Sequence, residues 1–286
     1  MKRVYTVFFA VLLGVLTSGC IETHMLITVE KDGSGTVQER VVMNNMVVGM
    51  MQGMANSMGG EDTETEAPDE LFSREDVLEQ AAEMGEGVEL VSFEEVKEAA
   101  GTGYVAVFSF DDINTLRVKQ DPGESMPTMP GESEEEEPMD EEENEHIFFA
   151  FEPGSPARLT ITPPDMKEGE EEEEVDMEVE VEEEEGEAEG EIQLGGFEQM
   201  AQFMRGMHVS MVVHVRGDIV ETNAQYAEGS KITIMDIDFD KLIDDPEKLK
   251  ELEAAENKGP AAVQELLKDI PGMKVDVSED IFVTFN

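Results

Sequence analysis

Cysteine, tryptophan and basic residues are scarce in this chain of 286 residues. It has one Cys and no Trp, and 19 Lys and Arg stand against 69 Asp and Glu, a formal net charge of −50. A single Cys excludes an intramolecular disulfide. The shortage of basic residues excludes a protein that binds nucleic acid through clustered positive charge. It also argues against a body that binds anionic lipid by its own charge.

Sequence signatures of catalysis are missing as well. The chain has no G-x-S-x-G nucleophile motif, no H-E-x-x-H zinc motif and no phosphate-binding P-loop. Gly85-Glu-Gly87 follows a helical segment instead of a strand, so it indicates a helix end and a turn. We therefore predict that the protein is not an enzyme and that it uses no cofactor.

The N-terminus has the pattern of an export signal. Lys2 and Arg3 precede an uncharged run over residues 4–16, and small residues follow before Cys20. A basic start, a short apolar stretch and small residues are typical of a secretory signal. The run is shorter than the roughly 20 apolar residues of a transmembrane helix.

The segment Leu16-Thr17-Ser18-Gly19-Cys20 resembles the lipobox of bacterial lipoproteins. The resemblance implies that residues 1–19 are a signal peptide, that the Cys20 thiol receives a diacylglyceryl group and that the new amine is acylated, for example with palmitate. Two or more acyl chains hold a protein stably on a membrane. An ordinary signal peptide with an incidental Cys, or an uncleaved anchor, is the alternative. Ile21 after the Cys resembles the class sorted to the outer membrane in Gram-negative cells.

Alternating apolar and polar residues predict strands joined as hairpins. The first hairpin turns at Asp32-Gly33-Ser34-Gly35, and Ser73 with Asp76 forms a capping box that predicts a helix. The expected fold class is α+β: a mostly antiparallel sheet built from hairpins, with several short helices and disordered acidic insertions. Strands are expected within 25–42, 88–110, 147–162, 207–237 and 274–285. Helices are expected within 43–58, 73–84, 197–206, 245–257 and 260–268.

Two acidic runs interrupt this pattern. Residues 132–145 hold 10 acids in 14 positions, and residues 168–191 hold 16 in 24. Like charges repel and bury no apolar area, so we expect disordered insertions at 119–145 and 163–194. The hairpin between them needs cover for Phe148, Phe149 and Phe151. This favours one discontinuous domain over residues 20–286, with two separate domains as the alternative.

A second resemblance lies near the C-terminus. The segments Met211-Val-Val-His-Val-Arg-Gly217, Ile219-Val220, Thr222-Asn223-Ala224 and Lys231-Ile-Thr-Ile234, together with the first hairpin, look like the LppM-type lipoprotein domain of mycobacteria. The resemblance implies a β-rich fold and a role in the cell envelope. It implies no chemistry, because that family has no established catalytic residues to carry over.

Two cation sites are conceivable from the sequence. Thioethers suit Cu(I), so Met46, Met50, Met54, Met204 and His208 could form a soft site. Regular helical spacing of Met is more typical of a core, or of an adaptable apolar groove.

The acids Asp236, Asp238, Asp240, Asp244 and Glu247 follow the spacing of a calcium loop, but Lys241 occupies the place that requires Gly. Outward-facing and helix-capping acids are the simpler interpretation. The four His are scattered, and we expect them to be solvent-facing polar residues.

These observations predict a lipoprotein anchored to the membrane of a bacterial cell envelope. It would act as a non-enzymatic binding or structural module that captures a lipid or a protein partner on a Met- and Phe-rich apolar face. Cation binding, by Ca or Cu, is the alternative function. Cys20 is the single predicted site residue, and no catalytic or metal site is assigned.

Overall fold

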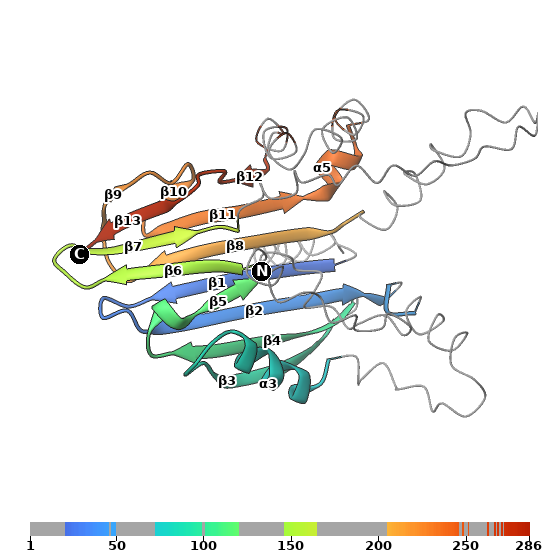
Figure 1. Ribbon diagram of the computed structural model, residues 1–286. Coiled ribbons are helices and arrows are strands. Elements are labelled where there is room, and N and C mark those ends of the chain that lie inside the picture. Colours follow the sequence, from blue (N-terminus) through green and yellow to red (C-terminus); the bar gives the residue numbers. More distant parts are fainter. Residues whose placement is uncertain are drawn as a thin grey trace, which may run out of the picture.

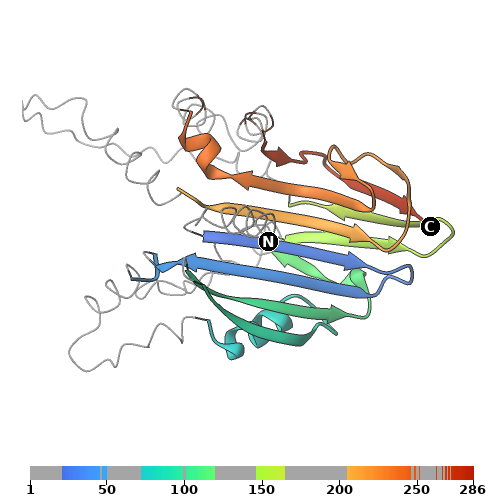
Figure 2. The same ribbon diagram turned by 180° about the vertical axis from the view of Figure 1, so that it is seen from behind.

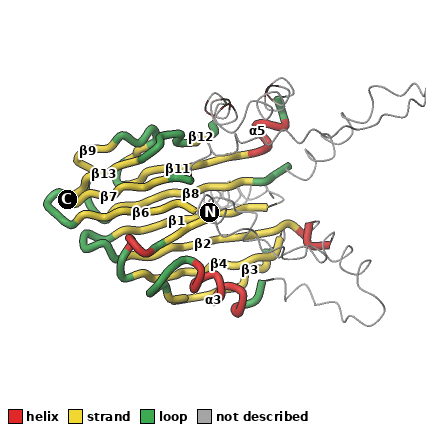
Figure 3. Tube along the Cα trace, viewed as in Figure 1, coloured by secondary structure: helices red, strands yellow, loops and turns green. Residues whose placement is uncertain are grey.

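The chain folds into two β-sheets that lie against each other, as a computed structural model shows (Figure 1). The structure describes residues 21–45, 47–49, 72–98, 101–119, 146–164, 205–245 and 272–286, together with residues 248, 251, 262, 266, 268 and 270. Strands dominate the described part, as the tube drawn by secondary structure makes plain (Figure 3).

The larger sheet has eight strands and runs the length of the molecule. In spatial order these are β10 (Ala227–Glu228), β11 (Lys231–Asp238), β8 (His208–Val215), β1 (Ile21–Val29), β2 (Gly35–Asn44), β4 (Gly101–Phe110) and β3 (Glu89–Lys97), with β12 (Lys274–Val275) paired to β11. Neighbours are antiparallel except for β1 and β8, which run parallel. Segments from the two halves of the sequence therefore meet at the centre of this sheet.

The smaller sheet has five antiparallel strands. In spatial order these are β5 (Arg117–Lys119), β6 (His146–Glu152), β7 (Ala157–Thr162), β13 (Ile281–Phe285) and β9 (Ile219–Thr222). The expected hairpin β6–β7 is present, and it is completed by β5 on one side and by the C-terminal strand on the other. Phe149 and Phe151 of this hairpin are buried in the cluster that contains residues of the larger sheet, whereas Phe148 is partly exposed.

The core lies between the sheets and consists mainly of strand residues. Along β1 and β8 every second side chain points inward, and the burial pattern alternates accordingly. Ile27 and Val213 of the larger sheet belong to the same buried cluster as Leu159 and Val283 of the smaller sheet. Each sheet thus covers the apolar face of the other, which is the main stabilising effect in a two-layer β fold.

Three helical elements lie wholly within the described part: α3 (Arg74–Glu83), the 3-10 turn η2 (Ile113–Thr115) and α5 (Phe239–Ile243). Residues 45 and 47–49 after β2 are helical as well. The predicted capping box is confirmed, because Asp76 N–H donates to Ser73 and Ser73 N–H donates to Asp76. Inside this helix, Gln80 Nε2 donates to the buried carboxylate of Glu39 at 2.9 Å, which ties α3 to the sheet.

The α+β fold class is wrong. The described residues form a two-sheet β protein in which α3 and α5 lie at the periphery (Figures 1 and 3). The sequence predicted one mostly antiparallel sheet with several short helices, and a single sheet needs other elements to cover its apolar face. Instead, the second sheet covers that face, so no helical layer is required. Much of the helical prediction, including residues 50–58 and 197–204, lies outside the described residues.

The two ends of the larger sheet differ, and we name them by residues. At the Ile21 end, β1 and β8 begin, β2 and β11 end, and α5 follows (Figure 1). At the Gly33 end, the β1–β2 turn lies against the smaller sheet, because an added Cβ on Gly33 would meet the Phe151 ring at 2.7 Å. The polar cluster described next lies toward the Ile21 end.

Candidate functional site

The outer face of the larger sheet carries polar side chains at its centre, and it is turned toward the viewer in Figure 2. The residues of β1 and β8 that do not enter the core point outward, among them His24, His208 and Ser210. The parallel register pairs Glu22 with His208 and His24 with Ser210. This register brings two histidines from distant parts of the sequence onto neighbouring strands.

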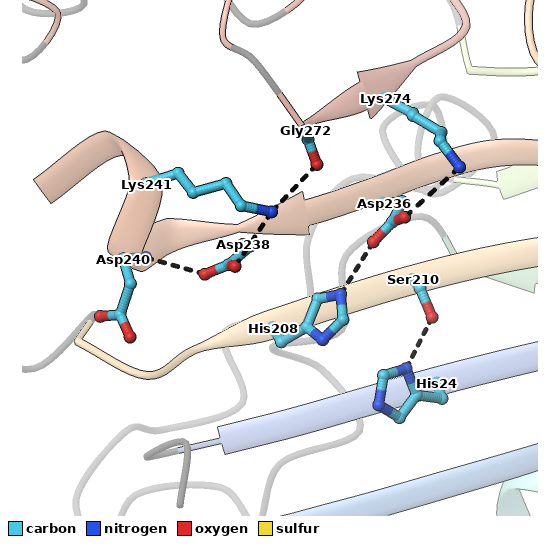
Figure 4. Close-up of polar contacts among 9 residues, drawn as sticks. All are labelled: His24, His208, Ser210, Asp236, Asp238, Asp240, Lys241, Gly272 and Lys274. Carbon is cyan, nitrogen blue, oxygen red and sulfur yellow. Dashed lines mark hydrogen bonds and ion pairs between the residues drawn. The ribbon is translucent and has the colours of Figure 1, made fainter. Parts of the chain in front are cut away.

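Two hydrogen bonds define the cluster (Figure 4). His24 Nδ1 and Ser210 Oγ share one at 2.6 Å, and His208 Nε2 and Asp236 Oδ1 share another at 2.8 Å. Asp236 also lies 3.8 Å from Lys274 Nζ, so its carboxylate is held between a histidine and a lysine. The cluster therefore joins β1, β8, β11 and β12.

The two imidazoles touch each other. The ring centroids of His24 and His208 lie 4.9 Å apart at an interplanar angle of 88°, an edge-to-face contact. Burial lowers the pKa of His24 below its ordinary value, and the neighbouring His208 lowers it further. A proton on one ring opposes a proton on the other, so the pair favours the neutral form of His24.

The expectation that the four histidines are scattered is thus incomplete. His208 and His214 share the outer face of β8. The contact between His24 and His208, which lie 184 positions apart in the sequence (208 − 24), depends on the β1–β8 pairing. No local pattern reveals such a register.

The described acids with calcium-loop spacing make contacts with other residues of the chain. Asp238 caps α5 and lies 3.1 Å from Lys241 Nζ (Figure 4). Asp240 accepts a hydrogen bond from Gly206 N–H at 2.8 Å. Asp244 pairs with Arg205 at 3.1 Å. The described residues contain no group of three or more His, Cys, Asp or Glu that could hold a metal ion. The simpler interpretation, outward-facing and helix-capping acids, agrees with these contacts.

A shallow hollow of about 570 Å³ lies beside the cluster on the same face. Its lining combines apolar side chains, including Leu26 and Val212, with Arg40 and Lys231. Arg40 is held by Glu98 at 3.1 Å at the rim of the sheet. The hollow is open to solvent and has mixed chemistry.

The cluster does not form a nucleophilic triad. Ser210 contacts His24, whereas Asp236 contacts His208, so the serine and the carboxylate are attached to different rings. In a triad one imidazole receives the serine proton on one nitrogen and is oriented by the carboxylate through the other. The arrangement instead cross-links three neighbouring strands.

The predicted Met- and Phe-rich face is largely internal where the structure describes it. Met25, Met43 and Met211 lie in the core, as do Phe149 and Phe151. The core interpretation of methionine therefore holds for these side chains. Several predicted site residues lie outside the described residues. They are the possible copper ligands Met46, Met50, Met54 and Met204, the predicted lipidation site Cys20, and Glu247 of the calcium-loop spacing.

Comparisons with known proteins give one weak similarity. No protein-family model and no curated protein matches the chain. The NMR structure of the folded domain of LppM from Mycobacterium tuberculosis aligns at 9% sequence identity and a TM-score of 0.27, over 75% of this chain and 81% of that one. So low a score does not establish a shared fold, and the two-sheet architecture rests on the strand pairing of this chain.

None of the helices formed by the described residues has the length and apolar character that crossing a bilayer requires.

Proposed function

We propose that this chain is a lipoprotein of the bacterial cell envelope, held on a membrane through Cys20, and that its β body is a non-enzymatic binding or structural module. The observation that carries the proposal is the sequence Leu16-Thr17-Ser18-Gly19-Cys20 at the end of an uncharged run. Cys20 is the single Cys of the chain, and thioether formation would remove a reactive thiol from an exported protein.

The fold supports a binding or structural role for the body. Within the described residues, no second layer covers the outer face of the larger sheet, and its central polar residues make contacts between strands, such as His24 with Ser210. The module would capture a lipid or a protein partner on apolar surface. Among the described Met and Phe residues, Met207, Phe93, Phe148, Phe239 and Phe282 are partly exposed.

Replacing Cys20 tests the anchor. Cells that express the full chain are given a palmitate analogue, and the mature protein is followed by labelling, by intact mass and by membrane fractionation. We expect Cys20→Ser to abolish labelling and cleavage, because the acceptor thiol is lost. Ser18→Ala is the matched control, since it keeps a small residue beside the cleavage site and should be labelled normally. An unlabelled wild-type protein would exclude the lipoprotein.

Native mass spectrometry tests the binding role. The full chain is purified from its own host in mild detergent, and the masses of any bound species are read directly. A copurified lipid or protein of defined stoichiometry is the expected result. A bare polypeptide, recovered repeatedly under these conditions, would leave a purely structural role for the body.

A further inference from the structure

The first strand begins directly after the proposed lipid attachment site. β1 starts at Ile21, which is 8% exposed and pairs with Met43 of β2. Consecutive Cα atoms are about 3.8 Å apart, so the Cα of Cys20 lies within that distance of a residue fixed in the sheet. Most of the freedom that a tether would give is therefore absent, and an acylated Cys20 would hold the Ile21 end close to the lipid.

The described neighbours of Ile21 on β2 and β4 are uncharged, whereas Glu22 follows it in β1 and pairs with His208. The uncharged residues lie on β2, on the helical turn after it, on β4 and just before β8: Met43, Asn44, Asn45, Val47, Val48, Gly49, Gly101, Thr102 and Met207. The sequence has no charged residue from Val41 to Gly60, in a chain with a net charge of −50. Uncharged groups lose less free energy than charged ones when they leave water at a headgroup layer.

Charged residues flank this surface, and several of them are paired. Arg205 contacts Asp244 at 3.1 Å on the side of α5, and Lys97 contacts Glu95 at 3.2 Å on the side of β3. Each pair has a formal charge of zero. Their contribution to repulsion from lipid is therefore small compared with that of unpaired acids.

The opposite end of the sheet is acidic. Exposed acids outnumber exposed basic residues around the Gly33 end: Glu30, Asp32, Asp111, Asp112, Glu152 and Asp218 stand against Lys31 and Arg216, and Arg216 lies 3.6 Å from Glu30. The nine residues of β1 span about 30 Å, which is several times the Debye length of roughly 8 Å at physiological salt. With the Ile21 end on the membrane, these acids lie beyond the reach of the lipid surface charge.

We infer that the Ile21 end of the larger sheet, around Met43, Asn45, Val47, Gly49 and Met207, is the surface that faces the lipid headgroups. The β-strands then stand away from the bilayer and the Gly33 end points into the aqueous phase. The inference rests on the proposed lipidation of Cys20 and adds the orientation of the body. Acyl chains alone, on a long flexible tether, would not define an orientation.

Site-specific fluorescence quenching on vesicles tests the orientation. Gly49→Cys places a thiol at the Ile21 end, where an added Cβ meets nothing within 4 Å, and Lys31→Cys places one in the exposed turn at the Gly33 end. The thiol of Cys20 is blocked by its lipid, so only the introduced thiol takes a fluorophore. The lipidated full chain is reconstituted in phosphatidylcholine vesicles that contain phosphatidylcholine with a nitroxide on the headgroup. Uncharged lipid is used so that the lipid surface does not repel the two acidic runs. These runs connect to the body at Lys119, His146, Pro164 and Arg205.

The expected result is several-fold stronger quenching of the Gly49 label than of the Lys31 label. A matched variant inserts a Gly/Ser linker of about 20 residues between Cys20 and Ile21, with an end-to-end distance of about 25 Å. The linker should abolish most of the Gly49 quenching while the protein still floats with the vesicles.

Equal quenching at the two labels, or Gly49 quenching that the linker leaves unchanged, would overturn the orientation while the lipoprotein stands. The intact mass of the protein shows whether the proposed acylation of Cys20 itself has failed. A protein without added acyl mass, which does not float with the vesicles, would overturn the lipoprotein proposal and the orientation together.

Discussion

At the scale of single residues, the pair of histidines on β1 and β8 is the most specific feature of the outer face. Each ring is oriented by its own partner, Ser210 for His24 and Asp236 for His208. His208 adds to the effect of burial in lowering the pKa of His24, because charge on a neighbouring ring disfavours charge on His24. The lowered pKa of His24 makes the stability of the fold sensitive to pH.

Replacing His208 should raise the pKa of His24. The variant His208→Gln removes the second cause of the lowered pKa and leaves the first, burial. The pKa of His24 should move toward its ordinary value of 6.5 without reaching it. NMR titration of the imidazole protons measures the change. His214→Gln, on the same face of β8, is the control and should leave the His24 titration unaltered.

The same pKa sets the direction of a pH effect on folding. A lowered pKa in the folded state means that the unfolded chain binds a proton at higher pH. The contribution of His24 to stability is therefore complete above pH 6.5 and is lost as the pH falls from there through the folded pKa. Urea unfolding is measured above pH 6.5 and again below the pKa of His24 in the folded protein. The loss of unfolding free energy on acidification should be smaller in His24→Gln than in the wild type.

A buried carboxylate holds the loop before the last strand. Asp276 is 5% exposed and accepts hydrogen bonds from Gln225 N–H at 2.7 Å and from Ser278 N–H and hydroxyl. Asp276→Ala leaves these donors without their acceptor, so we expect a loss of about 1–3 kcal/mol in the free energy of unfolding. Urea denaturation measures it. The exposed Asp111→Ala should change stability little, and equal effects of the two variants would contradict this role.

At the scale of elements, the β1–β2 turn connects the two sheets. Gly33 has φ of 91° and is buried against Phe151 of β6, and its carbonyl accepts a hydrogen bond from Ile113 N–H at 2.9 Å. The turn that the sequence predicted as a hairpin loop is therefore also a contact between the two layers.

An alanine at position 33 should destabilise the fold. A non-glycine residue at this φ carries strain of about 1–3 kcal/mol, and the new Cβ would press on the Phe151 ring. Thermal unfolding of Gly33→Ala should show a lower midpoint than the wild type. Gly49→Ala is the control, because its Cβ meets nothing within 4 Å. An unchanged midpoint in Gly33→Ala would show that the turn is not fixed by this contact.

At the scale of the whole molecule, the acidic runs are interruptions between strands. Lys119 of β5 and His146 of β6 are paired directly across the smaller sheet, although residues 120–145 separate them in sequence. Deleting residues 121–144 would leave two residues, Gln120 and Glu145, to connect this pair. Two residues are the commonest length of a tight hairpin loop.

Removing both acidic runs should therefore preserve the fold. With residues 121–144 and 168–191 deleted, we expect an unchanged β signal in circular dichroism and one cooperative unfolding transition, as a single discontinuous domain requires. The salt dependence of stability should decrease, since the two deletions remove 27 acids. Two separate transitions would favour the alternative of two domains.

The sequence alone determined the strands and their inward faces. Alternation located most of β1, β2, β3, β4, β6, β7, β8 and β11, because a side-chain period of two is a local property. The capping box of Ser73 and Asp76 was equally local. The lipobox resemblance around Cys20, which carries the proposed function, also needs no structure.

Only the tertiary structure decided how these strands assemble. Three features are contacts between segments that lie far apart in the sequence, and no local period encodes them. They are the parallel pairing of β1 with β8, the placement of the β6–β7 hairpin beside β13 and the stacking of the two sheets. The contact of His24 with His208 follows from the register of β1 and β8. The assembled sheet also defines which of its ends adjoins Cys20, because β1 starts at Ile21. Local side-chain preferences act within a few residues, whereas partner choice among strands is made by burial of the whole core.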